Sequence, residues 1–376
     1  MSEKGKIKIL ILENSFDVTG AFKSIFGLTR SISHEFEFHF AIRKNTRLSS
    51  LLAKEKTPFI ELPFLEISKY WKTIFYLPML FLNTCRVVLY TNRHQIRIVH
   101  INDLYNMIGV MIKIVNPKIK VIYHVRLMPD SYTAILYPYW LKLINRWTDQ
   151  VIVVSDAVYQ SIKMNVSKPT QIIYDFVPLE EKWSKPKEES ETIRFVYPAS
   201  YSRGKGQDFA LKAFAELHRT FKNILLTFYG SDAGNKKNDQ FKKELIRDRD
   251  AAGLNDVVLF EGHTDNIEKV IKEADVALMF SASESFSLVC YEALFYGTPI
   301  IASDCGGPRE LIEDYTSGIL VGNKDIASMT RAMTAIAADS ALRVRISKNA
   351  RGHIRDKISQ HNASDRLRRV YKQHLT

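Results

Sequence analysis

The residues best suited to chemistry stand where a predicted strand turns into a predicted helix, in the second half of the chain. Glu284 lies in that turn, and Glu292 follows after seven intervening residues, one to two turns into the helix. A carboxylate placed there can accept hydrogen bonds from a sugar diol, as an acidic residue does for ribose in dinucleotide sites. The first backbone N–H groups of the helix, near Phe286, Ser287 and Leu288, can hold oxygen-rich or anionic groups. The segment therefore predicts a site for a ligand with hydroxyls and anionic oxygens.

Glycines follow this segment at two further boundaries. Gly297 is typical of the end of a helix, just before the next predicted strand. A second glycine-bearing turn, with Gly306 and Gly307, comes after that strand and leads into another helix. Glycine in such a turn lets the backbone approach a ligand closely. The alternative is that both serve only as turn residues.

Strands and helices must alternate along the chain to position these residues. Short apolar runs separated by segments of helical length favour a mainly parallel sheet with helices on both faces. The predicted strands cover residues 6–12, 36–42, 58–62, 97–101, 120–125, 150–155 and 171–174 in the first half, and 193–198, 224–229, 257–260, 275–280, 299–302 and 318–321 in the second.

A charged, proline-containing segment, residues 179–192, interrupts the alternation and predicts a linker. The sequence therefore predicts an α/β protein of two Rossmann-like doubly wound domains, over residues 1–178 and 193–350. A basic helix is expected over residues 351–376. Ligands of such sheets bind at the carboxyl ends of the strands, so the expected site is a cleft between the two domains.

The order of these motifs resembles that of glycosyltransferase family 4, whose members are retaining, metal-independent enzymes of the GT-B fold. The resemblance rests on Glu284, Phe286, Glu292, Gly297, Pro299, Gly306, Gly307 and Glu310, and earlier in the same half on Lys205, Gly206, Gly230 and Gly318. It covers most of the C-terminal half and is weaker before it. The resemblance implies that the two domains face each other across a cleft and that the C-terminal helix crosses back to the N-terminal domain.

The resemblance also implies a role for each matching residue in binding a nucleoside diphosphate sugar. Glu292 would bind the ribose hydroxyls, Glu284 the hydroxyls of the transferred sugar, and Lys205 the diphosphate. The backbone amides of residues 286–288 would assist Glu284. No protein nucleophile is needed, because the acceptor hydroxyl attacks the face from which the diphosphate leaves. Lys205 and Glu284 are thus the expected catalytic residues of this half.

Departures from the family pattern concern three further sites. The family often has an arginine five residues before the lysine; Ser200 stands there, and Arg203 is a candidate substitute. Ser287 replaces a family glycine, which narrows the space beside the sugar. Gly230 after the second strand, and Gly20 as the single glycine of the first loop, complete the expected donor-binding set.

The family histidine at the end of a strand in the N-terminal half is also changed. The aligned position is Arg126, and His124 lies two residues earlier on the same face of the predicted strand 120–125. We expect one of the two to take the catalytic place of that histidine; burial or pairing elsewhere is the alternative. Asp103 can meet the acceptor or cap a helix.

Composition narrows the functional class. The 376 residues carry a net charge of +12, are 46% hydrophobic, and include three widely spaced cysteines, which argues against disorder, a disulfide framework and a structural zinc site. No signal peptide or membrane-spanning helix is predicted. The net charge is +9 in residues 1–180, −5 in 181–340 and +8 in 341–376. We therefore expect a cytoplasmic protein, peripheral on an anionic membrane at most.

No cofactor and no metal are expected, because the Asp248-Arg-Asp250 motif sits in a charged helical run and is read as a solvated face. The predicted function is transfer of a hexose-type sugar to a lipid-linked or saccharide acceptor in bacterial surface polysaccharide synthesis, such as O-antigen, capsule or exopolysaccharide. Alternatives are a sugar-nucleotide epimerase of the same fold and a non-catalytic sugar-nucleotide-binding partner. A nucleic-acid-binding protein is disfavoured because no recognition motif is present.

Overall fold

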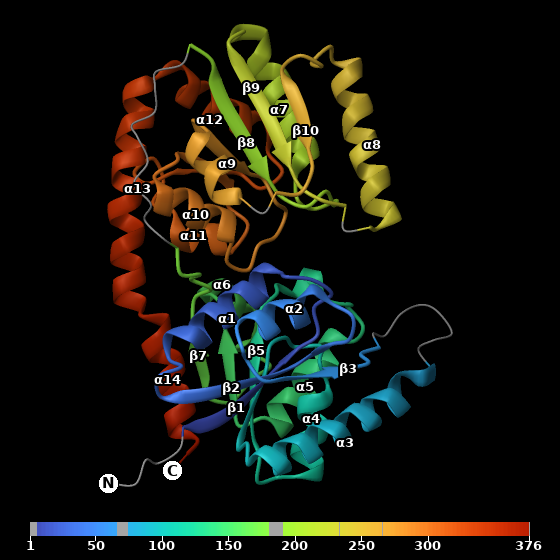
Figure 1. The fold of residues 1–376 in the computed structure, drawn as a ribbon. Coiled ribbons are helices and arrows are strands. Elements are labelled where there is room, and N and C mark those ends of the chain that lie inside the picture. The colour runs from blue at the N-terminus through green and yellow to red at the C-terminus, as the bar shows by residue number, and fades with distance from the viewer. Residues whose placement is uncertain (1–5, 66–73, 180–190, 233, 265, 376) are drawn as a thin grey trace. The chain divides into compact units, whose positions relative to one another are not determined.

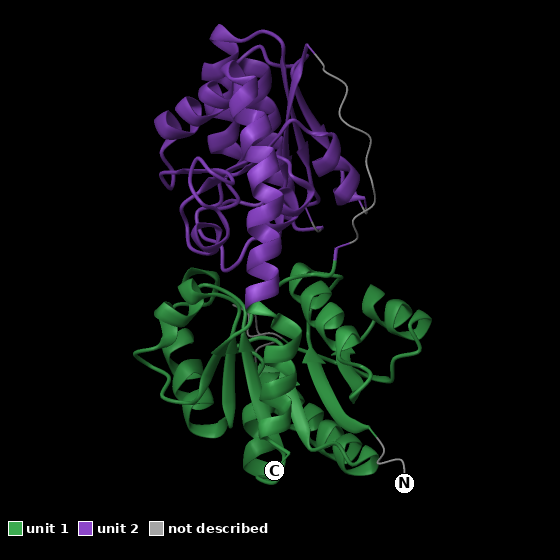
Figure 2. Ribbon diagram, turned by 90° about the vertical axis from the view of Figure 1, so that its left-hand side faces the viewer, with its two compact units in different colours: residues 1–178, 361–376 green, residues 179–360 purple. Residues whose placement is uncertain are grey.

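The computed structural model describes residues 6–65, 74–179, 191–232, 234–264 and 266–375. The chain divides into two compact units, coloured separately in Figure 2: unit 1 comprises residues 1–178 and 361–376, and unit 2 comprises residues 179–360. Each contains one wholly parallel sheet with helices packed against it (Figure 1). The predicted fold class, α/β with two Rossmann-like domains, is confirmed.

Seven strands make up the sheet of unit 1, in the order β3-β2-β1-β4-β5-β6-β7. Their bounds are β1 Ile7–Glu13, β2 Phe36–Arg43, β3 Phe59–Leu62, β4 Ile98–Ile101, β5 Lys120–Val125, β6 Gln150–Val153 and β7 Thr170–Ile172. The inner strand β1 is apolar without alternation because helices cover both faces of the sheet, and Ile9, Leu10, Ile11 and Leu12 are fully buried.

The α-helices in the described part of unit 1 are α1 Gly20–Ser31, α2 Arg47–Lys54, α3 Tyr76–His94, α4 Ile108–Val115, α5 Tyr137–Trp147, α6 Asp156–Ile162 and α14 Ala363–Gln373. Polar side chains fix where some of them begin. The Thr19 hydroxyl accepts a hydrogen bond from the Phe22 N–H at the start of α1, and Ser155 does the same for Val158 at the start of α6. No helix among the described residues is both long enough and apolar enough to cross a membrane.

Unit 2 has six strands in the order β10-β9-β8-β11-β12-β13. Their bounds are β8 Ile193–Pro198, β9 Ile224–Tyr229, β10 Val258–Glu261, β11 Val276–Met279, β12 Ile300–Ser303 and β13 Ile319–Val321. The helices are α7 Gln207–Thr220, α8 Lys236–Ala251, α9 Ile267–Glu273, α10 Leu288–Tyr296, α11 Gly307–Leu311, α12 Ile326–Ala338 and α13 Ser340–His361. In both sheets the strand order reverses beside the first strand, which is the place where doubly wound sheets bind ligands.

The basic C-terminal helix differs from the prediction. Two helices, α13 and α14, replace the single helix expected over residues 351–376, because Asn362 adopts a left-handed conformation with φ of 40° and caps the next helix through Asp365 N–H. Asparagine tolerates this conformation better than most residues do. Up to residue 360 the chain belongs to unit 2, where Arg351 donates hydrogen bonds to the Tyr296 carbonyl.

The final helix α14 packs on unit 1, as predicted for the end of the chain. Its Tyr371 is fully buried against the rings of Phe36 and Phe38 and lies 2.7 Å from His100 Nδ1. Lys372 pairs with Glu35 at 2.5 Å on the surface beside it. The chain therefore returns to the N-terminal unit after completing unit 2.

Predicted and observed strand boundaries agree within one or two residues. Among the helices, α8 begins at Lys236, with Asn235 as its cap. Gly297 ends α10 in a left-handed conformation, with φ of 71°, as predicted. Most of the predicted linker, residues 180–190, lies outside the described residues.

Candidate active site

An ion pair joins two loops at the carboxyl edge of the unit 2 sheet. Lys205, between β8 and α7, donates from Nζ to Glu284 Oε1 at 2.7 Å, across 79 residues of sequence. The negative charge of Glu284 raises the pKa of Lys205 and outweighs the opposing effect of burial. The side chains keep 36% and 17% of their exposure, so the pair is reachable from solvent. The structure thus brings together two of the predicted catalytic residues.

A buried tyrosine on β8 holds these two loops together. Tyr197 is 1% exposed; its hydroxyl donates to the Lys205 carbonyl and accepts from the Phe280 N–H at 2.6 Å. Gly206 allows the same approach, because it has a φ of 78° and an added Cβ would lie 2.0 Å from the Phe280 carbonyl oxygen. The position of Lys205 is therefore fixed by its own backbone neighbours.

The two glycine-bearing turns of the sequence lie side by side. The Glu284 N–H donates to the Cys305 carbonyl at 3.2 Å, and the Gly307 N–H donates to the Glu284 carbonyl at 2.8 Å. A Cβ on Gly307 would lie 2.4 Å from Phe286 Cα, so no larger residue fits without displacing that turn. Gly307 therefore has a packing role in holding Glu284, beyond that of a turn residue.

The helix α10 begins at Leu288 with an unusual cap. Ser287 has a φ of 75° and a ψ of 89°, and its hydroxyl accepts from the Cys290 N–H at 3.4 Å. Phe286 is buried before it, and Glu292 is half-buried one turn further along the helix. The left-handed φ explains why a glycine suits the position of Ser287. The helix N-terminus and Glu292 lie on the same element, as predicted.

Three other predicted donor-binding residues occupy the loops around this edge. Ser200 is exposed after β8, and its carbonyl accepts from Gln207 Nε2 at 2.8 Å. Gly230 follows β9 and packs against Ala199. Arg203 pairs with Glu244 of α8 and lies over the Phe241 ring at 5.0 Å. The structure therefore places the Arg203 side chain against α8.

The predicted catalytic pair of the first half lies inside unit 1. His124 and Arg126, both on or just after β5, are 0% and 2% exposed. The Arg126 guanidinium donates to Asn102 Oδ1 at 2.7 Å, to His124 Nδ1 at 3.2 Å and to Asp175. Burial, reinforced by the charge of Arg126, lowers the pKa of His124 well below its usual value. Neither side chain reaches the surface, so the structure shows the alternative named for both residues, burial and pairing inside unit 1.

The buried network extends to the other strand ends of unit 1. Asn102 donates to Glu13, and Ser24 donates to Asp175 Oδ1 at 2.7 Å. His100 Nε2 lies 3.2 Å from His124 Nδ1, and burial lowers the pKa of His100 to about 3. Gly20 is the first residue of α1, above this edge of the sheet. The network holds the ends of β1, β4 and β5 together.

Potential metal ligands are scattered. No group of three His, Cys, Asp or Glu side chains that could hold a metal ion occurs among the residues that the structure describes. Asp248 and Asp250 are exposed on α8, where Asp250 pairs with Arg249 at 2.6 Å. Their motif is therefore part of a solvated helix surface.

Part of the chain is similar to a known protein family. Residues 180–353 match the family described as "Glycosyl transferases group 1". The matched residues contain all of β8 to β13 and the Lys205–Glu284 pair. Two curated relatives are similar over part of the chain. The lipopolysaccharide core biosynthesis mannosyltransferase LpcC of Rhizobium leguminosarum is 30% identical over 170 residues, 44% of this chain and 47% of the relative.

A D-inositol 3-phosphate glycosyltransferase of Corynebacterium kroppenstedtii is 31% identical over 157 residues, 40% of this chain and 34% of the relative. The chain thus matches less than half the length of either. Two solved structures share the fold over almost the whole chain. Anabaena HepE with UDP-glucose has a TM-score of 0.82 at 18% identity, covering 98% of this chain and 100% of that one. Sucrose-phosphate synthase of Thermosynechococcus elongatus has a TM-score of 0.80 at 18% identity, covering 98% and 99%.

Sequence reasoning missed one residue within the matched segment, residues 180–353. Tyr197 ties the Lys205 loop to the end of β11, yet it stands in an apolar strand and reads as core. The available signal was its hydroxyl, since a buried tyrosine normally finds a hydrogen-bond partner.

Proposed function

We propose that the chain is a retaining glycosyltransferase that moves a hexose-type sugar from a nucleoside diphosphate donor to a lipid-linked or saccharide acceptor. The observation that carries the proposal is the Lys205–Glu284 ion pair beside the start of α10, at the carboxyl edge of the unit 2 sheet. Doubly wound sheets bind nucleotides at this edge. The match of residues 180–353 to group 1 glycosyltransferases supports the same reaction class.

Lys205 supplies the electrostatic part of the proposed mechanism. Its ammonium has three N–H donors, of which Glu284 takes one, so donors remain for diphosphate oxygens. In the reaction the acceptor oxygen bonds to the anomeric carbon as the bond to the diphosphate breaks, and the acceptor proton passes to the leaving phosphate. Charge grows on that phosphate, and a fixed cation stabilises it. Glu284 orients hydroxyls of the transferred sugar, and Glu292 binds the ribose.

The named relatives favour hexose transfer and a role in surface polysaccharide assembly. LpcC is named as a mannosyltransferase of lipopolysaccharide core biosynthesis, and HepE was solved with UDP-glucose. We therefore include in the proposal a hexose as the transferred sugar and a role in surface polysaccharide assembly. Independence from metal ions is also part of the proposal.

A donor panel tests the proposal. The purified protein is incubated with UDP-, GDP- and ADP-hexoses in EDTA, and release of the nucleoside diphosphate and free sugar is followed. We expect slow hydrolysis of one donor, with the anomeric configuration of the first product retained. No turnover with any donor contradicts the proposal, and release of an epimerised sugar supports the epimerase instead.

A substitution tests the ribose contact of Glu292. Glu292→Gln removes the charge but keeps the shape, and a hydrogen bond to a charged group contributes about 1.5–3 kcal/mol. We expect the Kd of the selected donor to rise roughly 10- to 150-fold. The matched control is Glu216→Gln on α7, whose partner Arg219 is exposed. Equal donor affinity in both variants removes the ribose role.

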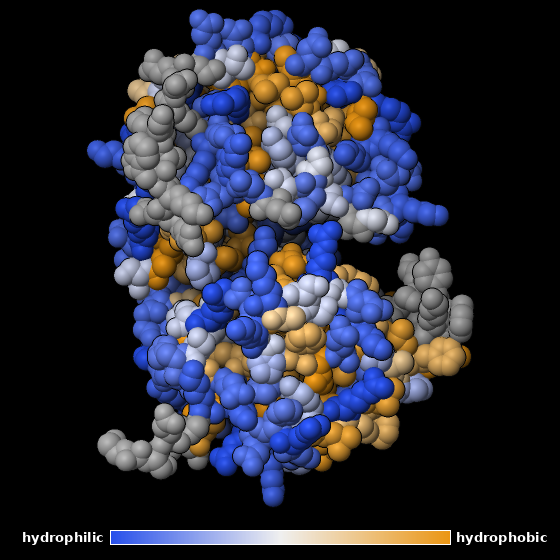
Figure 3. All heavy atoms as spheres, in the orientation of Figure 1, coloured by the Kyte–Doolittle hydropathy of each residue, from blue (hydrophilic) through white to orange (hydrophobic). Residues whose placement is uncertain are grey.

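The apolar surface of unit 1 supports the lipid-surface part of the proposal. Leu77, Phe81 and Leu89 of α3 are 60–70% exposed, and hydrophobic side chains gather along this helix in Figure 3. The neighbouring helices α3, α4 and α5 carry five Lys or Arg and no Asp or Glu. Exposed apolar side chains with cationic neighbours suit an anionic membrane surface.

Co-sedimentation with vesicles tests this surface. We expect binding that requires anionic lipid, weakens with salt and is reduced by Leu77→Ser with Phe81→Ser. Met164→Ser, which changes an exposed apolar residue beyond α6, is the matched control. Vesicle binding that is absent, or equal in all variants, contradicts the membrane proposal and leaves donor turnover as a separate result.

A further inference from the structure

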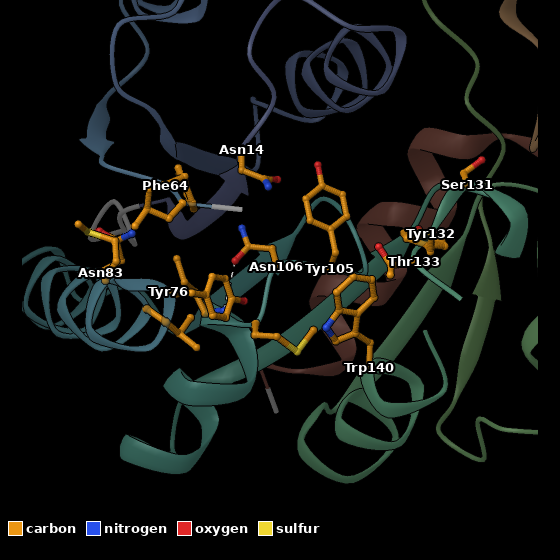
Figure 4. Close-up of a pocket in the computed structure, with 15 residues that line it drawn as sticks. Asn14, Phe64, Tyr76, Asn83, Tyr105, Asn106, Ser131, Tyr132, Thr133 and Trp140 are labelled. Carbon is orange, nitrogen blue, oxygen red and sulfur yellow. Dashed lines mark hydrogen bonds between the residues drawn. The ribbon is translucent and has the colours of Figure 1, made fainter. Parts of the chain in front are cut away.

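Unit 1 has a basic pocket between the outer strand β7 and the helix α14. Its volume is about 170 Å³. The residues that line this basic pocket are Gln171, Arg366, Arg369, Val370 and Gln373. A larger pocket of unit 1, at the carboxyl edge of the sheet, has no Asp, Glu, Lys, Arg or His among its 15 lining residues (Figure 4). Of these two pockets, only the one beside α14 offers an anion a counter-charge.

The place of the basic pocket follows from how α14 packs on unit 1. One flank of α14 lies against the end of α1, where the hydroxyls of Ser31 and Ser364 are 2.7 Å apart and Arg368 pairs with Glu35 at 3.1 Å. The pocket lies along the other flank, beside the edge strand of the sheet. The buried Val370 supplies the apolar part of its lining.

The two arginines of the basic pocket have uncommitted guanidinium nitrogens. Arg366 Nε donates to the His361 carbonyl at 2.6 Å, and Arg369 Nε donates to the Asp365 carbonyl at 3.4 Å. Among the residues that the structure describes, the terminal nitrogens of both arginines have no hydrogen-bond or ion-pair partner. Arg366 is half-buried and Arg369 is exposed, so a ligand can reach them from solvent. The contact with His361 restrains Arg366, which lowers the entropy cost of binding.

Neighbouring carboxylates do not neutralise this charge. Asp365 pairs with Arg368 at 3.0 Å and accepts a hydrogen bond from Asn362. Glu35 is occupied by Arg368 and Lys372 on the other flank of α14. The five described residues that line the basic pocket include no Asp or Glu. The ligand that suits this lining is therefore an anion.

The spacing of the two arginines favours a phosphate group over a carboxylate. Residues three apart on a helix have Cβ atoms about 5–6 Å apart, so both guanidinium groups can reach one ligand. Each guanidinium can donate two parallel hydrogen bonds to a pair of oxygens. A carboxylate has a single pair of oxygens, whereas a phosphate has several and carries up to two negative charges. A single water needs only about 10–15 Å³ of such space, so the pocket has room for this group.

The basic pocket lies on the face of the sheet that α14 shares with α1. The connection from β1 to β2 through α1 and the connection from β4 to β5 through α4 run in opposite directions along the sheet. Since crossovers between parallel strands are right-handed, α1 and α4 cover opposite faces. The helix α14 packs beside α1, whereas α3 and α5 pack against α4. The pocket is therefore separate from the exposed apolar surface of α3, which favours a phosphate in solution over that of a lipid headgroup.

We propose that the basic pocket is a phosphate-binding site in which Arg366 and Arg369 hold the phosphate group of a soluble ester, or inorganic phosphate, with Gln171 as a further N–H donor. All of its residues belong to unit 1, and the proposal does not depend on the proposed function. A ligand that joins α14 to β7 binds only the folded unit, so it stabilises the return of the chain onto unit 1.

Titration with simple anions tests the site. Inorganic phosphate, glycerol 1-phosphate and acetate are added to the full chain at constant ionic strength, and the backbone amide signals are followed by NMR. We expect saturable shifts at residues 171 and 366–373 with both phosphates, and binding of acetate that is at least several-fold weaker. Phosphate bound beside Lys205 is recorded separately, by residues 199–207. No saturable shift at the basic pocket with either phosphate, or equal affinity for acetate, overturns the proposal.

Two variants locate the binding. In Arg366→Gln and in Arg369→Gln, we expect the Kd of phosphate to rise about 10-fold or more, because hydrogen bonds between charged groups are lost. Arg369 is exposed, so its variant should fold as the unaltered chain does. The matched control is Lys372→Gln, which removes one positive charge from the flank that faces Glu35 and should leave the Kd nearly unchanged. An unchanged Kd in Arg369→Gln, or an equal rise in Lys372→Gln, overturns the proposal.

Vesicles distinguish the two sources of the phosphate group. Arg369→Gln and the unaltered chain are co-sedimented with phosphatidylcholine vesicles that contain phosphatidic acid. We expect the same vesicle binding for both, because the basic pocket takes its phosphate from solution. Vesicle binding that depends on Arg369, without any response to the soluble phosphates, overturns the assignment to a soluble ligand.

Discussion

The two units have the same parallel α/β architecture but differ in how exposed the ion pair at the carboxyl edge of the sheet is. At the carboxyl edge of unit 1, Arg126 and Asp175 pair in the interior, with side chains 1% and 11% exposed. At the same edge of unit 2, Lys205 and Glu284 pair where solvent reaches them. A buried pair is committed to its own loops, whereas a partly exposed pair can exchange contacts with a ligand. Of the two pairs, only Lys205–Glu284 remains accessible to a ligand.

The largest expected effect comes from breaking the buried pair of unit 1. Asp175→Asn leaves the Arg126 guanidinium in the interior without a counter-charge, and we expect a loss of about 3–5 kcal/mol in the free energy of unfolding. Chemical denaturation measures it. The matched control is Asp304→Asn in unit 2, whose partner Arg309 is 71% exposed, and there the expected loss is about 0–1 kcal/mol. Similar losses in both variants would refute the contrast between the units.

The next effect concerns the accessible pair of unit 2. Lys205→Ala removes the cation proposed to stabilise the leaving diphosphate, and we expect kcat/KM to fall on the order of 100- to 1000-fold. Lys212→Ala, at an exposed position of α7, serves as the control for loss of one positive charge. The rates are measured with the donor that the panel selects. A fall of less than 5-fold for Lys205→Ala would remove its catalytic role.

Acid should destabilise unit 1 more than unit 2, because the buried histidines all belong to unit 1. They are His39, His100, His124 and His361. Burial lowers the pKa of His100 and of His361 from 6.5 to about 3. The folded state therefore binds fewer protons than the unfolded state, and stability is lost as the pH falls below 6.5. The loss is about 1.4 kcal/mol per pH unit for a fully buried histidine such as His100.

Asp103 opposes this trend, since burial raises its pKa to about 7 and its protonation favours the folded state. With four histidines against one carboxyl, we expect unit 1 to lose protection before unit 2 between pH 6.5 and 5. Hydrogen exchange, corrected for the intrinsic rate, measures each unit separately. Equal loss in both units would show that the buried histidines do not control acid stability.

The smallest expected effect is a gain in stability at the start of α10. Ser287→Gly relieves the left-handed φ of 75° and loses only a weak cap, so we expect the free energy of unfolding to rise by about 1 kcal/mol. The neighbouring Ser283, whose φ is not positive, gives the control variant Ser283→Gly, which should be neutral or destabilising. A loss of stability in Ser287→Gly would mean that the Ser287 hydroxyl contributes more than the backbone strain costs.

Most of the fold was predictable because apolar runs and glycines carry local signals. The buried run of β1 and the end of α10 at Gly297 follow from chain-local chemistry. The break at Asn362 was missed, since asparagine reads as an ordinary helix residue unless its backbone conformation is known. The hydrogen bonds by which Tyr197 joins two loops were also missed, because they cannot be read from the local sequence.

The candidate site was predictable only in unit 2. Lys205 and Glu284 lie in strand-to-helix turns and Glu292 lies in helix α10, and the order of these elements is readable from sequence. His124 lies on β5 as predicted, and Arg126 comes directly after that strand, but the sequence did not decide whether they are buried. His124 is buried beside His100, which in turn contacts Tyr371, 271 residues further along the chain. Long-range burial of this kind leaves no local pattern.

The central claim is that unit 2 binds the donor through the Lys205 and Glu284 loops. Hydrogen exchange of the full chain, with and without the nucleotide sugar that the panel selects, tests it most directly. The account predicts that added protection falls on residues 199–207 and 281–310, and that Lys205→Ala abolishes it at the same donor concentration. Donor protection confined to other segments, or unchanged in Lys205→Ala, would contradict it.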